Sequence, residues 1–379
     1  MKGFSSRRRV GAALAVIALT AALFLASPMN AADASASWDE RLGTGGQRPA
    51  LSLDLSRLFG GAAGTNHAGR MLMPGSAAVG VAMNTQGVLV VGLGEGPGMQ
   101  AGLRAGDLLL AVNGVPLETA ETLTAAVTAA QGQPVQLLID RDGRERTVQV
   151  HPRFDESART WRLGLWVRDS TAGVGTLTYY DPANSAYGAL GHAITDTDTG
   201  SILPVRAGDL MRAEIVDVRK GQRGTPGELR GSFLREQAIL GTVRKNTVYG
   251  IFGTLRAAWT NPLYPAGLPV GDRNAVHTGA ASILSTVSGD TIREYGVEIT
   301  QVTRQSRAAP KSLVLRVTDP ALLSATGGIV QGMSGSPILQ DGKIIGAVTH
   351  VFVSDPTQGY GVFIDWMLDE SDGLAEQKE

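Results

Sequence analysis

The chain has 379 residues, a formal net charge of -1 and no cysteine. This length is sufficient for two folded domains with their own cores. The lack of cysteine excludes disulfides, thiolate metal sites and a cysteine nucleophile, and the balanced charge without a basic stripe argues against nucleic-acid binding. We therefore expect a globular protein that is stabilised by packing and uses no metal and no cofactor.

The first residues predict a targeting element rather than a part of the fold. Basic residues at 7–9 precede an apolar run over 10–26, a pattern that keeps the start of the chain in the cytoplasm and exports the remainder. The run is long for a signal peptide and slightly short for a span of about 20 residues, so a retained anchor and cleavage in the Ala-rich stretch 32–36 are both open. We favour the anchor, assign 1–37 to it and its juxtamembrane stretch, and assign 38–72 to a flexible tether.

Residues 73–152 combine short apolar strands with one helical stretch. The segment 101–114, AGLRAGDLLLAVNG, predicts a turn, a strand and an Asn-Gly turn, and 118–130 has helical spacing. This segment is similar to a PDZ domain, a module that binds extended peptides or chain ends at a sheet edge. A module that only positions the next domain is the alternative. The loop that would bind a peptide carboxylate is expected at Val79, Gly80 and Val81.

From 153 to 368 the chain contains many short apolar stretches separated by Gly-containing turns. This spacing is typical of an all-β barrel or sandwich. The acidic residues 369–379 predict a solvated tail. The chain as a whole is expected to be mainly β.

A serine stands between glycines in the segment GMSGSP, residues 332–337. Glycine permits a tight turn that exposes one hydroxyl, and a strand, an Asp-Gly turn and a second apolar strand follow, as in trypsin-like peptidases. An ordinary hairpin loop is the alternative. We predict that Ser334 is the nucleophile and that the amides of Gly332 and Ser334 form the oxyanion hole. The substrate strand is expected at Thr349, His350 and Val351.

A serine hydroxyl needs a base, and histidine is the usual one. His192 ends a strand of small residues, GALGHA, and precedes Ser334 in the chain, as the base does in trypsin-like folds. A third group should orient the imidazole, and Asp319 closes an apolar strand shortly ahead of the serine. The remaining histidines lack such a context: His67, His151, His277 and His350. Competitors of the aspartate are Asp196, Asp198 and Asp209.

Two long motifs resemble the SpoIVB family of sporulation serine peptidases. They read VGTLTYYDPANSAYGALGHAITD and GGIVQGMSGSPILQDGKIIGAVTHVFVSDPTQGYGVFIDWML. The resemblance, which extends to the N-terminal membrane segment and the PDZ-like unit, implies a triad of Ser334, His192 and Asp319. It also implies a membrane-anchored, extracytoplasmic endopeptidase in the space between the forespore and mother-cell membranes. There the peptidase would cleave itself and a regulatory membrane protein in signalling that activates a late sigma factor.

A non-catalytic envelope adaptor with a degenerate peptidase domain is the other hypothesis. The presence of all three catalytic side-chain types argues against it. The PDZ-like unit would bind a partner or the chain's own released end, and its position directly ahead of the peptidase domain suggests that it restrains the peptidase in cis.

Overall fold

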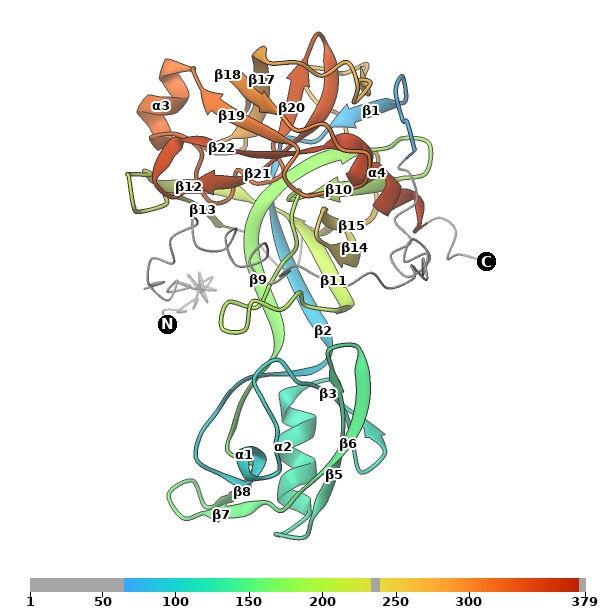
Figure 1. The fold of residues 1–379 in the computed structure, drawn as a ribbon, viewed down its shortest axis with the longest axis vertical. Coiled ribbons are helices and arrows are strands. Elements are labelled where there is room, and N and C mark those ends of the chain that lie inside the picture. Colours follow the sequence, from blue (N-terminus) through green and yellow to red (C-terminus); the bar gives the residue numbers. More distant parts are fainter. Residues whose placement is uncertain (1–64, 233–238, 375–379) are drawn as a thin grey trace, which may run out of the picture. The chain divides into compact units, whose positions relative to one another are not determined.

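The computed structural model describes residues 65–232 and 239–374 (Figure 1). The expected anchor, 1–37, lies outside these residues, as do most of the expected tether and the last part of the acidic tail. Across the described ranges, no helix combines the length and the apolar character that a membrane span requires. The described residues are mainly in strands.

Outside the PDZ unit the chain forms two barrels, called the two-barrel body below. A ring of antiparallel strands forms the first of these barrels. In order of pairing its strands are β9 (Leu165–Tyr180), β10 (Ala186–Ala189), β15 (Gly250–Leu255), β14 (Ile239–Thr247), β11 (Val205–Arg212) and β2 (Ala78–Leu93). The ring closes because β2 also pairs with β9. Its interior is filled by alternate apolar side chains of these strands, among them Val79, Val81 and Leu177. Strand β1 (Met71–Pro74) pairs with β9 and with β16 (Leu268–Pro269).

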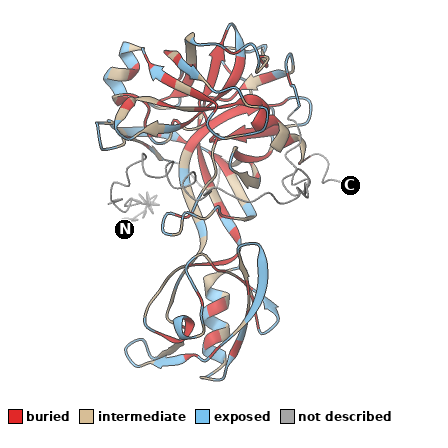
Figure 2. Cartoon of the chain, in the orientation of Figure 1, coloured by how far each residue is buried: buried red, intermediate tan, exposed pale blue. Residues whose placement is uncertain are grey.

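A second, closed barrel follows in the chain. Its strands are β17 (Gly279–Thr286), β18 (Ile292–Val302), β19 (Leu313–Val317), β22 (Asp355–Phe363), β21 (Lys343–Phe352) and β20 (Pro337–Gln340). Helix α3 (Pro320–Thr326) follows β19, helix α4 (Ile364–Asp372) follows β22, and β12 (Glu214–Arg219) pairs with β13 (Glu228–Ser232). Figure 2 shows the buried residues concentrated along the barrel strands. The expected all-β arrangement is confirmed, and it consists of barrels.

The PDZ unit has its own core, formed by Leu109, Leu123, Leu137 and Ile139 with other buried side chains. Its elements are α1 (Pro97–Gln100), β3 (Leu108–Val112), β4 (Val115–Pro116), α2 (Ala120–Ala129), β5 (Val135–Arg141), β6 (Arg144–Val150), β7 (Arg153–Asp155) and β8 (Thr160–Arg162). Thr119 caps α2 by accepting the Thr122 amide at 3.2 Å. The predicted helix is present as α2, and β5 and β6 pair as a hairpin after it.

Two long strands, β2 and β9, belong to both units. Residues 78–84 of β2 pair with β9 and β11 in the first barrel, whereas Val88 and Leu89 pair with β3 of the PDZ unit. The expected boundary at 73 therefore places barrel residues in the PDZ unit. Strand β2 is thus needed by the first barrel as well as by the PDZ unit.

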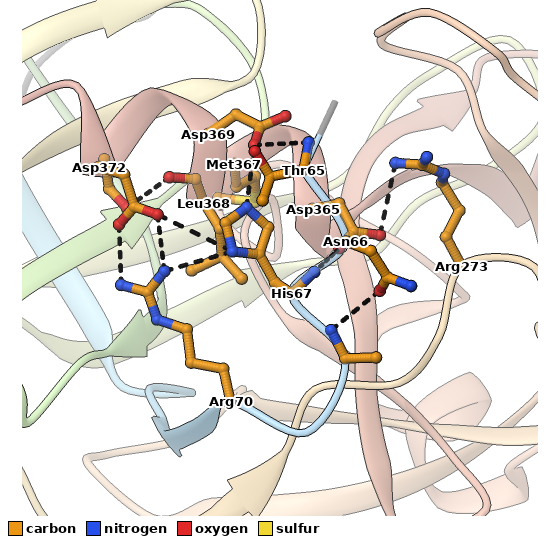
Figure 3. Close-up of polar contacts among 12 residues, drawn as sticks. Thr65, Asn66, His67, Arg70, Arg273, Asp365, Met367, Leu368, Asp369 and Asp372 are labelled. Carbon is orange, nitrogen blue, oxygen red and sulfur yellow. Dashed lines mark hydrogen bonds and ion pairs between the residues drawn. The ribbon is translucent and has the colours of Figure 1, made fainter. Parts of the chain in front are cut away.

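The last residues of the expected tether, 65–72, are bound to the two-barrel body (Figure 3). His67 Nε2 lies 2.9 Å from Asp369 Oδ1, and Arg70 binds Asp372 at 2.7 and 2.8 Å. Arg70 also binds the buried carboxylate of Asp181, with Nε at 2.9 Å. Asp369 and Asp372, expected at the start of a solvated tail, therefore belong to a helix that holds the N-terminal segment.

Candidate active site

Ser334 lies on a turn between α3 and β20 whose backbone favours glycine at the two positions that flank Met333 and Ser334. Gly332 and Gly335 have φ of 97° and 95°, in the left-handed region. A Cβ at Gly335 would lie 2.2 Å from the Thr176 carbonyl oxygen and 2.5 Å from the Leu190 nitrogen. The turn is thereby pressed against β9 and the end of β10 in the first barrel.

The carbonyls of this turn are held by the first barrel, whereas two of its amides have no acceptor among the described residues. Thr176 on β9 holds two carbonyls of the turn: its Oγ1 donates to the Gly332 oxygen at 2.8 Å and its N–H donates to the Ser334 oxygen at 3.0 Å. The neighbouring amides of Met333 and Gly335 have backbone acceptors. The amides of Gly332 and Ser334 donate to no acceptor within 65–232 and 239–374. Both remain available to an oxyanion.

The hydroxyl of Ser334 donates to the carbonyl oxygen of Thr349 at 2.6 Å. Thr349 lies on β21, beyond the point where β20 stops pairing at Ala347. The expected substrate strand thus has a carbonyl that faces the Ser334 turn. In this structure that carbonyl accepts the hydrogen bond of the Ser334 hydroxyl. Val351, the third expected residue of that strand, is half-buried and still pairs with Gly359 of β22.

A second turn brings His192 to the same strand. Leu190 and Gly191 have φ of 71° and 68°, and a Cβ at Gly191 would lie 3.1 Å from Thr349 Cγ2. His192 Nδ1 lies 2.8 Å from the Ala193 carbonyl oxygen, so Nδ1 carries the proton and Nε2 has the free lone pair that a base needs. Burial lowers the pKa of His192 below 6.5, which keeps the ring neutral at pH 7.

Ser334 and the turn that carries His192 both contact Thr349 of β21, whereas Asp319 has no hydrogen bond with Ser334 or His192. Asp319 caps helix α3: its Oδ1 accepts the Leu322 amide at 3.0 Å and its Oδ2 accepts the Gly296 amide at 3.4 Å. It belongs to the second barrel, whereas His192 follows a strand of the first. An aspartate followed by proline is also a helix start, and that is its role here.

The competing aspartates near His192 in the chain are engaged elsewhere. Asp196 accepts the Asp198 and Thr199 amides within its own loop and pairs with Arg168. Asp198 pairs with the same arginine at 3.0 Å. The Nδ1–H of His192 is therefore held by a neutral carbonyl instead of a carboxylate.

The expected carboxylate loop at Val79, Gly80 and Val81 is wrong. These residues lie in the middle of β2 and pair with β9 on one edge and β11 on the other. A peptide can add to a sheet only at a free edge, so this stretch cannot accept one.

A cavity of about 730 Å³ lies elsewhere in the PDZ unit, between α2 and the start of β9. Helix α2 contributes Leu123, Thr124 and Val127 to its wall. Most of the remaining lining comes from the β7–β8 hairpin and from Leu163, Gly164 and Leu165, which follow it. Within the described part of the chain, the amides of Leu163 and Gly164 donate to no acceptor, and Gly164 has a φ of 75°. An apolar-Gly-apolar triplet directly ahead of a strand was the signal that could have located this groove.

Two barrels, with a glycine-flanked serine and a neutral histidine on turns that both contact β21, are features of a serine peptidase, and here they are combined with a PDZ domain. The chain belongs to the SpoIVB peptidase S55 family, whose model matches residues 159–368. A PDZ domain model matches residues 90–141.

Individual proteins are similar over smaller parts. A stretch of 58 residues is 41% identical to the zinc metalloprotease RasP of Geobacillus kaustophilus and covers 15% of this chain and 14% of that protein. The inactive form of Rv3671c from M. tuberculosis is 11% identical, with a TM-score of 0.28 over 54% of this chain and 83% of that one. The PDZ domain of an SdrC-like protein from Listeria monocytogenes is 18% identical, with a TM-score of 0.20 over 22% of this chain and 87% of that one.

Proposed function

We propose that this serine peptidase is an endopeptidase in which Ser334 is the nucleophile and His192 the general base. The observation that carries the proposal is that both turns meet β21 at Thr349: Ser334 binds its carbonyl and Gly191 packs on its side chain. The alternative is a non-catalytic adaptor, in which the Ser334 turn would have only a structural role.

The reaction begins when a substrate strand adds along β21. A substrate N–H takes the Thr349 carbonyl, which releases the Ser334 hydroxyl to turn toward Nε2 of His192. Oγ then attacks the peptide carbonyl carbon while Nε2 takes its proton, and the amides of Gly332 and Ser334 stabilise the oxyanion. Nε2 gives the proton to the leaving amine as the C–N bond breaks, and water hydrolyses the acyl-enzyme by the same steps.

The groove in the PDZ unit supports a role in peptide binding. Its walls are apolar along α2, and two free amides lie at the Leu163-Gly164 turn, where they can receive a terminal carboxylate. A peptide with an apolar C-terminal residue fits this chemistry. The end released by self-cleavage is one such ligand.

The cellular role rests on the family and on the N-terminal sequence. The basic residues and the apolar run over 7–26 support a membrane anchor and an extracytoplasmic peptidase. Membership of the family supports cleavage of a regulatory membrane protein, and of the chain itself, in sporulation signalling between forespore and mother cell.

The test uses full-length protein in detergent, a quenched peptide and a fluorophosphonate probe that labels active serines. Ser334→Ala should abolish hydrolysis and labelling, and His192→Ala should reduce both by several orders of magnitude. Ser336→Ala is the matched control, because that hydroxyl lies two residues away and bonds to Ser285. Wild-type protein without Ser334-dependent labelling would favour the adaptor.

A further inference from the structure

The base of this site packs against a second imidazole. The ring centroids of His192 and His350 are 4.7 Å apart, with their planes inclined at 38°. The distance is that of a packed aromatic pair. The Nδ1–H of His192 donates to the neutral Ala193 carbonyl, and no carboxylate of the described residues hydrogen-bonds to this ring. The His350 ring is thus the aromatic side chain of the described residues that packs against this base.

We propose that His350 is a positioning residue of the peptidase, whose neutral ring holds the His192 imidazole in place and stabilises the imidazolium by facing it. This inference rests on the proposed roles of Ser334 and His192. It differs from the expectation that His350 only lines the substrate strand, because the side chain acts through the base.

The backbone of β21 places this ring. Thr349 presents its carbonyl to Ser334, and the next residue, His350, presents its side chain to His192. The His350 peptide is in turn packed on β22, where a Cβ at Gly359 would lie 2.6 Å from its oxygen. One strand thereby sets the positions of both the hydroxyl and the imidazole.

The surroundings of His350 keep its ring neutral. The residue is exposed at the surface, but desolvation of its packed side and, to a smaller extent, the charges of His192 and Lys311 lower the pKa of His350 to about 4. Lys311 lies over the ring of Tyr360 on β22, with Nζ 4.6 Å from its centroid. A protonated His350 would repel the imidazolium, whereas a neutral aromatic ring attracts a cation. At pH 7 His350 is in the form that the proposal requires.

The test compares His350→Phe, which keeps an aromatic face, with His350→Leu, which does not, in the full-length protein. His350→Leu should lower kcat about tenfold with little change in KM, and should move the acidic limb of kcat/KM to lower pH because the imidazolium loses its partner. His350→Phe should retain most of the rate and keep the limb where it is. Thermal unfolding of each variant controls for folding.

Equal losses in both variants, with the acidic limb unmoved, would overturn the proposal and make His350 a wall of the substrate site. If a variant does not fold, NMR titration of His192 in Ser334→Ala and in Ser334→Ala/His350→Phe gives the same comparison: matching pKa values support the proposal and a lower value with Phe contradicts it. Failure of the proposed function would appear separately, as the absence of Ser334-dependent hydrolysis in the wild type.

Discussion

The Ser334 hydroxyl is hydrogen-bonded to the Thr349 carbonyl at 2.6 Å, not to His192. This bond occupies the carbonyl that a substrate strand would use. In the proposed mechanism, substrate binding therefore also releases the Ser334 hydroxyl, because the Thr349 carbonyl accepts a hydrogen bond from each donor in turn.

A substrate methylated on the nitrogen that binds Thr349 should be cleaved poorly. Methylation removes the donor that displaces Ser334, and the loss of one hydrogen bond corresponds to a decrease of about threefold to tenfold in kcat/KM. Steady-state kinetics on the two peptides measures this. A peptide methylated three residues further from the cut is the control, and equal rates for all three peptides would contradict the role of Thr349.

Asp319→Asn should be nearly as stable and as active as the wild type. Asparagine caps a helix about as well as aspartate, whereas Asp319→Ala should cost about 1 kcal/mol of unfolding free energy through loss of the cap on α3. Urea unfolding and peptide hydrolysis check both points. A loss of about four orders of magnitude in kcat for Asp319→Asn, as for the acid of a trypsin-like triad, would instead show that the carboxylate orients His192.

The acidic limb of kcat/KM should lie below pH 6.5. His192 acts as a base only when neutral, and burial lowers its pKa, so acid must reach lower pH before activity falls. Protonation of His350 near pH 4 should then steepen the loss. Hydrolysis rates from pH 4 to 8 test this, and an acidic midpoint above 6.5 would indicate a carboxylate partner for His192.

Arg70→Ala should lower the unfolding free energy of the two-barrel body by about 3 kcal/mol, because it leaves the buried carboxylate of Asp181 without its cation. Urea unfolding measures the loss. Arg316→Ala is the control: its ion pair with Glu298 is exposed and screened by solvent, so its removal should leave the unfolding midpoint nearly unchanged. Equal effects of the two substitutions would show that residues 65–70 add no stability.

Thr124→Arg should block the groove beside α2. Thr124 lines the cavity, so a long side chain there should weaken binding of a fluorescent peptide with an apolar C-terminus at least tenfold, measured by anisotropy. Ala125→Arg is the control because Ala125 is exposed, faces away from Leu123 and Val127 on the same helix and does not line the cavity. If both variants bind the peptide as the wild type does, the groove is not the peptide site.

Local patterns were sufficient to predict the glycine turn around Ser334 and the PDZ unit. Gly332 and Gly335 adopt the left-handed backbone that the motif required, and the AGLRAGDLLLAVNG segment forms the turn and strand that its spacing indicated. These features depend on residues that are neighbours in the chain.

The partners of His192 and the position of the peptide groove depended on the tertiary structure. In the sequence, Asp319 is compatible with a triad acid and with a turn or helix start. Only the tertiary structure shows that it follows a strand of the second barrel and caps α3. The sequence predicted a peptide-binding loop at 79–81, and only the pairing of both edges of this stretch shows that it is a central strand that cannot accept a peptide. Contacts between segments more than a hundred residues apart, such as His192 with His350, are set by barrel closure and register, which no local pattern of residues encodes.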